Sequence, residues 1–260
     1  MSRNAIIGSN GFIGSALKRY ADKLVEEEWV GITRENYSQW RGKDFSTMIW
    51  CAGVASKRAS REDLIKDHIY GLSLALRDFS YNKFVYISSQ AVYEDSAKFM
   101  TANEDLVVRP EKLSDYAWVK YTGEKIVRMN TNDWLILRPN GFTGPGLRKN
   151  VVFDLMSNPP QLFVSPFSEI QYMHIDKFAE LILGSNLLKK SCKKLNITAH
   201  DEINPRQIAE ILGVSMDTVQ IKDNAPRFSA NMSVTKIEQL LNIQMPSCRE
   251  AVLNWNRPLY

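Results

Sequence analysis

The sequence predicts an α/β fold: a doubly wound parallel sheet followed by a small α/β lobe at the C-terminal end. Gly8, Gly11 and Gly14 directly follow a short apolar segment near the N-terminus. From there to Pro139, apolar segments of strand length alternate with segments of helix length. This alternation is typical of a right-handed parallel sheet with helices on both faces. Beyond Gly144 the pattern is sparser, which predicts a separate, smaller lobe.

Length and composition are those of an ordinary globular protein. The 260 residues are 44% hydrophobic and 24% charged, with a net charge of +4 scattered along the chain. This composition predicts neither a nucleic-acid partner nor a membrane partner. The three cysteines are widely spaced and no histidine has a neighbour at metal-ligand spacing, so we expect no disulfide and no metal site. Without a signal-peptide or membrane-span pattern, a cytoplasmic location is expected.

The first strand and turn have the pattern of a phosphate-binding loop. Residues 4–7 (NAII) form a short, mainly apolar run, and Gly8-x-x-Gly11-x-x-Gly14 leads into a helix-compatible segment. In a Rossmann-type fold such glycines permit the turn, let the backbone approach a pyrophosphate and let helix pack on strand. The spacing differs by one residue from Gly-x-Gly-x-x-Gly, and plain turns also contain such glycines. The predicted cofactor contacts are Gly8, Asn10, Gly11, Phe12, Ile13 and Gly14.

The end of the second strand indicates which dinucleotide is bound. The strand Trp29 to Thr33 is followed by Arg34, and an acidic residue, Glu35, comes only afterwards. An acid at this strand end would bind the ribose 2′-OH of NAD, whereas an arginine accommodates the 2′-phosphate of NADP. Arginine binds phosphate with a bidentate fork. Thr33 and Arg34 therefore favour NADP(H), while NAD(H) stays possible and Arg34 has the alternative of a solvent-exposed role.

The next two strands end in small or hydroxyl side chains. Residues 46–53 form an apolar strand that finishes with Ala52 and Gly53, where small residues let a cofactor pass close to the sheet. A helix is expected over residues 64–79, and His68 on its apolar stripe is interpreted as structural. Residues 83–89 form a strand that ends in Ser88 and Ser89, at the edge that faces the ligand crevice of an open parallel sheet.

Tyr116 and Lys120 are expected on one face of a helix that begins at Ser114 or Asp115. The pKa of a tyrosine is ~10, so its phenol is a poor acid or base at neutral pH. A neighbouring cation stabilises the phenolate and lowers that pKa, so the pair is suited to general acid–base chemistry. Because a Tyr-x-x-x-Lys spacing is common, a plain surface helix is the alternative.

A strand over residues 134–139 completes the first part of the chain, and residues 140–146 are interpreted as a hinge loop. We expect a dinucleotide-binding domain over residues 1–142 and a substrate-binding lobe over residues 143–260, some of whose segments return to the core. The elements expected in this lobe are a strand near 171–175, helices over 176–188 and 205–212, a strand near 195–198 and a final helix over 234–241.

Taken in order, these patterns resemble the extended branch of the short-chain dehydrogenase/reductase superfamily, the NAD(P)-dependent sugar-nucleotide epimerase/dehydratase family. The glycine turn, the strand ending at Ser89 and the Tyr116–Lys120 pair stand in the family's order. Ile87-Ser-Ser-Gln-Ala-Val-Tyr93 is similar to the family's strand with its catalytic hydroxyl, which aligns with Ser89. Residues 137–146 (LRPNGFTGPG) resemble the family's Arg-Pro and Gly-Pro-Gly loop, and residues 172–176 (YMHID) resemble its return to the core.

The resemblance implies roles for individual residues. Tyr116 would exchange a proton with the substrate, Lys120 would lower the Tyr116 pKa, and Ser89 would bind the reacting oxygen. The implied cofactor contacts also include Ala52, Gly53, Tyr116, Lys120 and Pro139. The implied contacts to a nucleotide-sugar substrate are Ser89, Asn140, Lys149, Asn150 and Arg227, the last three of which have ordinary surface positions as their alternative. A homodimer formed through paired helices is expected from the same resemblance.

Several reactions fit this family. A dehydratase carries an Asp-Glu pair directly after the catalytic hydroxyl, whereas Gln90 and Ala91 stand here, which argues against dehydration. Arg34 and the resemblance of residues 226–242 to 4-keto-6-deoxy-sugar-nucleotide reductases favour an NADPH-dependent reductase. A nucleotide-sugar 4-epimerase with tightly bound NAD is the alternative. A non-catalytic NAD(P) sensor is an alternative of another class, although such relatives commonly lack the Tyr/Lys pair.

Overall fold

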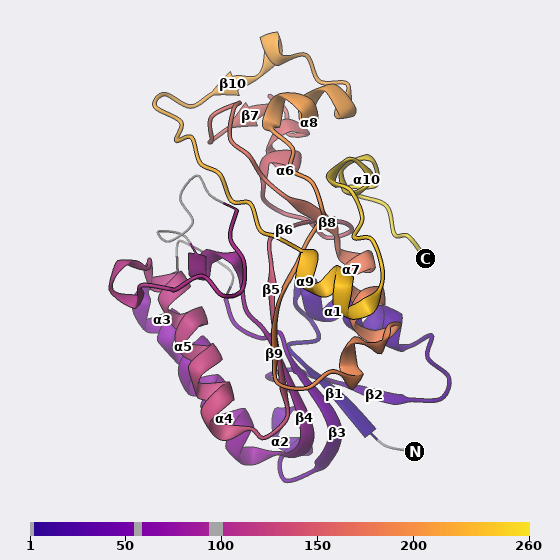
Figure 1. The fold of residues 1–260 in the computed structure, drawn as a ribbon. Coiled ribbons are helices and arrows are strands. Elements are labelled where there is room, and N and C mark those ends of the chain that lie inside the picture. The colour runs from indigo at the N-terminus through magenta and orange to yellow at the C-terminus, as the bar shows by residue number, and fades with distance from the viewer. Residues whose placement is uncertain (1–2, 55–58, 94–100) are drawn as a thin grey trace. The chain divides into compact units, whose positions relative to one another are not determined.

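The computed structural model describes residues 3–54, 59–93 and 101–260 (Figure 1). The chain forms two compact units that are interleaved in sequence. Unit 1 comprises Met1–Glu94, Val108–Pro139 and Ala179–Leu195, and unit 2 comprises Asp95–Val107, Asn140–Phe178 and Asn196–Tyr260. The division into domains at residue 142 stays a prediction.

A six-stranded sheet forms the centre of unit 1, with the order β2-β1-β3-β4-β5-β9. Every pair from β2 to β5 is parallel. The predicted doubly wound parallel sheet is therefore confirmed, with the strand order of the flavodoxin-like variant. The strands are β1 (Arg3–Ile7), β2 (Glu28–Ile32), β3 (Asp44–Trp50), β4 (Ser80–Ile87), β5 (Trp134–Pro139) and β9 (Lys193–Ile197).

The strand order reverses between β1 and β3, because β1 connects to β2 on one side and lies beside β3 on the other. In open α/β sheets, ligands bind outside the carboxyl ends of the strands at such a switch point. The helices cover both faces of the sheet, with α1 on one side and α3, α4 and α5 on the other (Figure 1). Their bounds are α1 (Phe12–Ala21), α3 (Arg61–Ile65), α4 (Gly71–Asp78) and α5 (Asp115–Asn130), and a short α2 (Tyr37–Trp40) follows β2.

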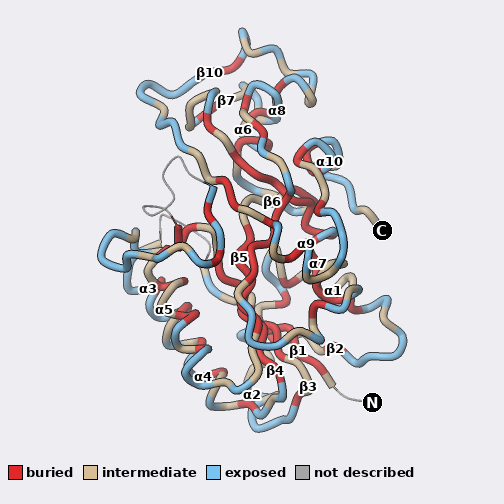
Figure 2. The backbone as a smooth tube through the Cα atoms, viewed as in Figure 1, coloured by how far each residue is buried: buried red, intermediate tan, exposed pale blue. Residues whose placement is uncertain are grey.

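The strands of the sheet are the most deeply buried part of unit 1, whereas the outer faces of α4 and α5 are exposed (Figure 2). The residues at the centre of β4, Phe84 to Tyr86, are completely inaccessible to solvent. Such continuous apolar runs are expected of parallel strands that helices cover on both faces. Leu72 and Ala75 of α4 and Val127 of α5 pack against this face of the sheet.

The helix expected over residues 64–79 differs from the structure in its beginning and in its middle. It begins at Arg61, where the Ser60 side chain caps the helix by accepting a hydrogen bond from the backbone N–H of Asp63. Between α3 and α4 it passes through a π-turn, Lys66–Tyr70, which carries His68. Periodicity does not reveal a single wide turn, and such π-turns occur frequently at functional sites.

Unit 2 contains two small parallel two-stranded sheets, β6 with β8 and β7 with β10. Its own core is formed largely by apolar side chains of α6, α8 and α10. No helix in the described part of the chain has the length and apolar character needed to cross a bilayer. The elements are β6 (Gly141–Thr143), β7 (Gln161–Leu162), β8 (Tyr172–His174), β10 (Gln220–Ile221), α6 (Val151–Leu155), α8 (Pro205–Leu212), α9 (Thr235–Leu241) and α10 (Cys248–Leu253), while α7 (Ile175–Leu183) continues from unit 2 into unit 1.

Three expectations for the C-terminal part need correction. The expected hinge loop 140–146 contains strand β6, which pairs with β8. The helix expected to reach residue 188 ends at Leu183 and is followed by a 3-10 turn, Asn186–Lys189. The helix over 234–241 is not the last, because α10 follows and is capped by reciprocal hydrogen bonds between Ser247 and Glu250. These elements are too short for a periodic pattern to reveal them.

Candidate functional site

The glycine turn brings the end of β1, the start of α1 and the end of β3 into close contact. Gly8 has a φ of +89°, and a Cβ there would lie 2.7 Å from the Cα of Ala52. A Cβ on Gly14 would lie 2.1 Å from the carbonyl oxygen of Gly8. Side chains at either position would therefore displace backbone, and their absence leaves a surface that a ligand's phosphates approach at short range.

Helix α1 begins directly after this turn. Gly11 is the N-cap residue, no described side chain caps the helix, and its first turn contains no acidic residue. The N-terminal end of a helix and its dipole favour an anion at such a position. Asn10 and Gly11 are exposed, while Phe12 and Ile13 are half-buried. The cradle and the uncapped helix fit the pyrophosphate of a dinucleotide.

A fixed loop with an exposed cation follows β2. The backbone N–H of Thr33 donates to the Asn36 side chain at 2.7 Å, and Asn36 in turn donates to the Gly31 carbonyl at 3.0 Å. Arg34 donates from Nη2 to the Asp67 carboxylate at 2.8 Å. A hydrogen bond from the Thr33 side chain lowers the pKa of Glu35, and the Arg34 charge acts in the same direction.

His68 occupies the space beside Gly53. The His68 ring is 1% exposed, and a Cβ on Gly53 would lie 2.4 Å from its Cε1. Nε2 lies 2.9 Å from the Val54 carbonyl, which only accepts, so Nε2 carries the proton. Nδ1 is then a buried acceptor without a hydrogen-bond partner among the described residues. Burial, together with the charge of Lys120, lowers the His68 pKa to about 4, so the ring is neutral at physiological pH.

His68, which the sequence predicts to be a structural residue, is buried and lies beside Tyr116. The His68 ring meets the Tyr116 ring edge to face, with 5.8 Å between the ring centroids and an interplanar angle of 83°. The sequence missed this contact because the two residues lie on different helical segments. One signal was present: a lone histidine on an apolar helical stripe directly after the strand that ends at Gly53.

Tyr116 and Lys120 lie one turn apart near the start of α5, which the Ser114 side chain caps by accepting from the Ala117 N–H. The Lys120 ammonium is buried and donates to the carbonyl of Ile87 at 2.9 Å. It also lies 5.4 Å from the centre of the Tyr86 ring. Burial lowers the pKa of Lys120 to about 8. The Lys120 ammonium is therefore held at the carboxyl end of β4. Its hydrogen-bond partner, Ile87, lies two residues before Ser89.

Ser88 and Ser89, which follow β4, have different environments. Ser88 is buried, and its hydroxyl donates to the Glu124 carboxylate at 2.6 Å. Ser89 is half-buried, and its hydroxyl oxygen accepts from the Ala91 N–H at 3.2 Å. The Ser89 hydroxyl proton is therefore not used in that bond, whereas the Ser88 proton is. This difference favours Ser89 as the reacting hydroxyl.

A buried ion pair, which no sequence pattern predicted, connects this region. Arg138 donates to both carboxylate oxygens of Glu124, from Nε at 2.8 Å and from Nη2 at 2.6 Å. Its Nη1 donates to the Tyr93 hydroxyl at 2.7 Å. Glu124 lies one turn after Lys120 on α5, and this spacing is the only sequence signal for the pair. The network ties α5, the end of β5 and the segment after Ser89 together.

The remaining predicted residues lie at the end of β5 or in unit 2. Pro139 is buried at the end of β5. The Asn140 side chain donates to the Ala230 carbonyl and accepts from the Gly141 N–H. Asn150 caps α6 through the Phe153 N–H and donates to the Phe142 carbonyl, both of which are structural tasks. Lys149 and Arg227 are exposed. The substrate roles of these residues stay predictions.

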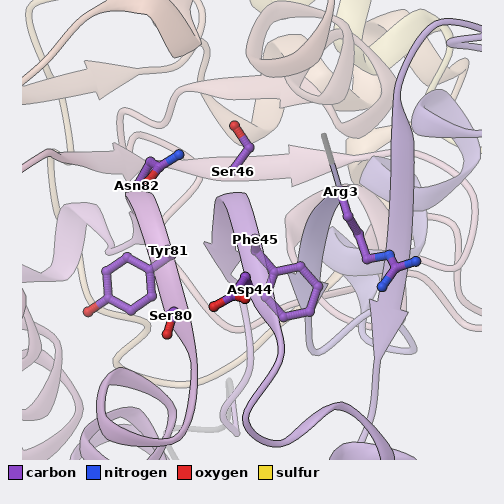
Figure 3. Close-up of a pocket in the computed structure, with 7 residues that line it drawn as sticks. All are labelled: Arg3, Asp44, Phe45, Ser46, Ser80, Tyr81 and Asn82. Carbon is purple, nitrogen blue, oxygen red and sulfur yellow. The ribbon is translucent and has the colours of Figure 1, made fainter. Parts of the chain in front are cut away.

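The surface hollow drawn in Figure 3 lies at the other edge of the sheet. Its lining comes from the first residues of β1, β3 and β4, whereas the glycine turn, Gly53 and Ser89 follow the carboxyl ends of these strands. The hollow therefore does not belong to the candidate site. The residues that line the hollow are Arg3, Asp44, Phe45, Ser46, Ser80, Tyr81 and Asn82.

In residues 3–54, 59–93 and 101–260, no cluster of His, Cys, Asp and Glu side chains is arranged to hold a metal ion.

The sequence is similar to known proteins over part of its length. The model of the NAD dependent epimerase/dehydratase family matches residues 47–158. A curated relative, the ceramide reductase of Caulobacter vibrioides (strain NA1000 / CB15N), is 28% identical over 192 residues. That match covers 69% of this chain, and the chain spans 59% of the length of the relative.

Solved structures are similar over nearly the whole chain. A mutant UDP-glucuronic acid 4-epimerase from Bacillus cereus, in complex with UDP-4-deoxy-4-fluoro-glucuronic acid and NAD, has a TM-score of 0.83 at 18% identity, with 97% of both chains covered. RMD from Pseudomonas aeruginosa, complexed with NADPH, has a TM-score of 0.76 at 17% identity, with 98% of this chain and 96% of the other covered. At such identities the likeness shows the fold.

Replacing Gly14 with Ala is expected to destabilise the protein and to weaken dinucleotide binding. The added Cβ would meet the Gly8 carbonyl oxygen at 2.1 Å, and backbone cannot rotate away. We expect a loss of ~1–3 kcal/mol in the free energy of unfolding, measured by urea denaturation, and weaker binding in an NADPH titration. The control is Gly71→Ala, where a Cβ has its nearest neighbour at 3.5 Å. Equal losses in the two variants would contradict the close-contact argument.

Replacing Glu124 with Gln is expected to cost ~3–5 kcal/mol of unfolding free energy, because the buried Arg138 charge loses its counter-charge. The control is Glu28→Gln, which breaks the exposed Arg3–Glu28 pair, a contact of 2.9 Å. That change is expected to cost less than ~1 kcal/mol. The unfolding free energies of both variants are measured by urea denaturation at neutral pH. A Glu124→Gln variant as stable as the control would show that the network is not needed for stability.

Lys120 is expected to make the stability of the cofactor-free protein depend on alkaline pH. Its pKa is lowered to about 8 from 10.5, so between these values the unfolded chain binds a proton that the folded protein does not. Stability therefore rises as the pH increases through this window, by at most ~3 kcal/mol. We expect the wild type to gain stability relative to Lys120→Met between these two pH values. A constant difference between the two proteins would rule out a lowered pKa.

Proposed function

We propose that this chain, whose residues 47–158 match the NAD dependent epimerase/dehydratase family, reduces a carbonyl group on a nucleotide-linked sugar, with NADPH as the reductant. A 4-keto-6-deoxy sugar is the proposed substrate. The observation that carries the proposal is the buried Lys120 ammonium, which is fixed beneath the strand end that bears Ser89 and lies one helical turn from Tyr116.

The proposed mechanism assigns one task to each side chain. Tyr116 acts as the general acid and gives its phenolic proton to the carbonyl oxygen of the substrate. Lys120 stabilises the phenolate that remains, because its ammonium lies on the same helix face. The Ser89 hydroxyl donates a hydrogen bond to the oxygen as negative charge develops on it. The nicotinamide, when bound, supplies the hydride.

Reduction is preferred to the other family reactions for two reasons. No carboxylate stands at Gln90 or Ala91 to eliminate water. Arg34 offers a guanidinium at the strand end where a 2′-phosphate would lie, which favours the dissociable cofactor NADPH. An epimerase that retains NAD would use the same Ser89, Tyr116 and Lys120, and a non-catalytic sensor would need none of them. The homodimer expected from the family resemblance belongs to the proposal as well.

A second candidate substrate class is a lipid that carries a carbonyl group. The curated relative is a ceramide reductase, and unit 2 exposes several large apolar side chains along one paired ribbon. Residues 161–169 run beside residues 220–229 through the β7–β10 pair and the hydrogen bonds Ser165 to Pro226 and Glu169 to Phe228. The exposed side chains of this ribbon are Phe163 (49%), Phe167 (54%), Ile221 (45%) and Phe228 (36%).

The proposal predicts that the purified protein oxidises NADPH when a 4-keto-6-deoxy nucleotide sugar is added, followed by nicotinamide absorbance. Tyr116→Phe should lower kcat by ~10²–10⁴-fold and Ser89→Ala by ~10²–10³-fold, with NADPH binding retained. Ser88→Ala is the matched control. It should lose stability through the Glu124 network and keep turnover close to wild type.

Other outcomes separate the alternatives. Turnover of a keto-lipid in detergent micelles, without turnover of nucleotide sugars, would select the lipid substrate. Release of stoichiometric NAD on denaturation, with no net oxidation, would identify an epimerase. If the protein binds NADPH without turnover, and Tyr116→Phe does not change that binding, the protein is a non-catalytic NAD(P) sensor. If neither NADPH nor NADH binds, the proposed function is wrong.

A further inference from the structure

Arg34 and Asp67 form an ion pair at the cofactor edge of unit 1. Nη2 of Arg34 lies 2.8 Å from Oδ2 of Asp67, and the side chains are 80% and 15% exposed, respectively. We propose that Asp67 is a specificity-determining residue: by pairing with Arg34, it limits the preference of the protein for NADPH over NADH. This inference rests on the proposed function, because it concerns the cofactor of the same site.

The pair spans the switch point of the sheet. Arg34 follows β2, while Asp67 lies on the π-turn of the helix that follows β3. In the sheet, β2 and β3 flank β1, whose carboxyl end leads into the glycine turn at Gly8. The ion pair therefore reaches across the carboxyl end of β1. In this class of fold, the adenosine ribose meets the residues that follow the second strand, which here include Arg34.

The side chains of Arg34, Glu35 and Asp67 together provide no net positive charge for a phosphate. Asp67 pairs with this guanidinium, and Glu35 is the next residue in the chain. A hydrogen bond from the Thr33 side chain and, to a smaller extent, the Arg34 charge lower the pKa of Glu35. The formal sum of the three side chains is therefore −1, from one positive and two negative charges. Glu35 is held by a hydrogen bond from the Thr33 side chain, whereas Asp67 bonds Arg34 directly. Of the two carboxylates, Asp67 is thus the direct competitor for the guanidinium.

Binding of a 2′-phosphate has to disturb this pair in one of two ways. Either Arg34 leaves Asp67, or the phosphate shares the guanidinium and lies within a few ångströms of the carboxylate, where like charges repel. An exposed ion pair is worth only ~0–1 kcal/mol, so the phosphate is able to compete. Both routes reduce the gain from Arg34 for NADPH. Neither affects NADH, whose ribose 2′-OH carries no charge.

The test is the dissociation constant of each dinucleotide, measured by isothermal titration calorimetry on the full chain without substrate. Asp67→Asn keeps the shape of the side chain and removes its charge. It should tighten NADPH binding by about three- to tenfold and leave NADH within about twofold. The NADPH gain should shrink at high salt, because exposed charges are screened. Glu62→Gln, which removes a negative charge from α3 of the same helical segment, is the matched control and should change neither constant.

A double-mutant cycle separates a direct effect on Arg34 from a general one. Arg34→Met should weaken NADPH binding alone, and adding Asp67→Asn to it should tighten NADPH binding less than the same change does in the wild type. An unchanged NADPH/NADH ratio in Asp67→Asn would overturn the inference. So would weaker NADPH binding in that variant, because Asp67 would then be orienting Arg34 for the phosphate. Failure of every variant to bind either dinucleotide would overturn the proposed function as well, which distinguishes the two failures.

Discussion

The arrangement of unit 1 depends on how the chain neutralises one buried carboxylate, that of Glu124. A buried charge is tolerated only when it is paired and its hydrogen-bonding capacity is used. Glu124 meets this condition with three bonds, two from Arg138 and one from the Ser88 hydroxyl. Because the donors come from the ends of β4 and β5, these bonds connect α5 to the carboxyl end of the sheet. Lys120 and Tyr116 lie one and two turns earlier on the same helix.

The same constraint explains why two adjacent serines have different environments. Ser88 is consumed by the network in the interior, and the backbone then places the next hydroxyl at the edge of the sheet. The π-turn makes a comparable contribution on the other helix, because its wider turn carries both His68, whose ring meets Tyr116, and Asp67, which meets Arg34. This one π-turn therefore carries residues that contact both ends of the expected dinucleotide site.

Much of this fold could be predicted from the sequence, because it is encoded locally. The strand Trp134–Pro139 and the helix Pro205–Leu212 have their predicted bounds, and the helix is marked by Asn204 as a capping residue and Pro205 in its first turn. The candidate site could be predicted from the sequence only in part. The glycine turn and the Tyr116–Lys120 pair are patterns within one segment. The Glu124–Arg138 pair, the His68–Tyr116 contact and the Arg34–Asp67 pair join segments whose proximity exists only after folding, and no periodicity or spacing reports it.

The position of β9 has a consequence for how this chain can be divided or synthesised. This strand lies beside β5 in the sheet, yet it is built from residues 193–197, after the whole segment Asn140–Phe178 of unit 2. While the chain is being made, the sheet stays one strand short until that point has been translated. A shortened chain that stops near residue 142 has the glycine turn, Ser89, Tyr116 and Lys120, but it exposes the edge of the buried, apolar strand β5. An uncovered edge of this kind pairs readily with other chains, so β9 protects the protein against self-association as well as completing its fold.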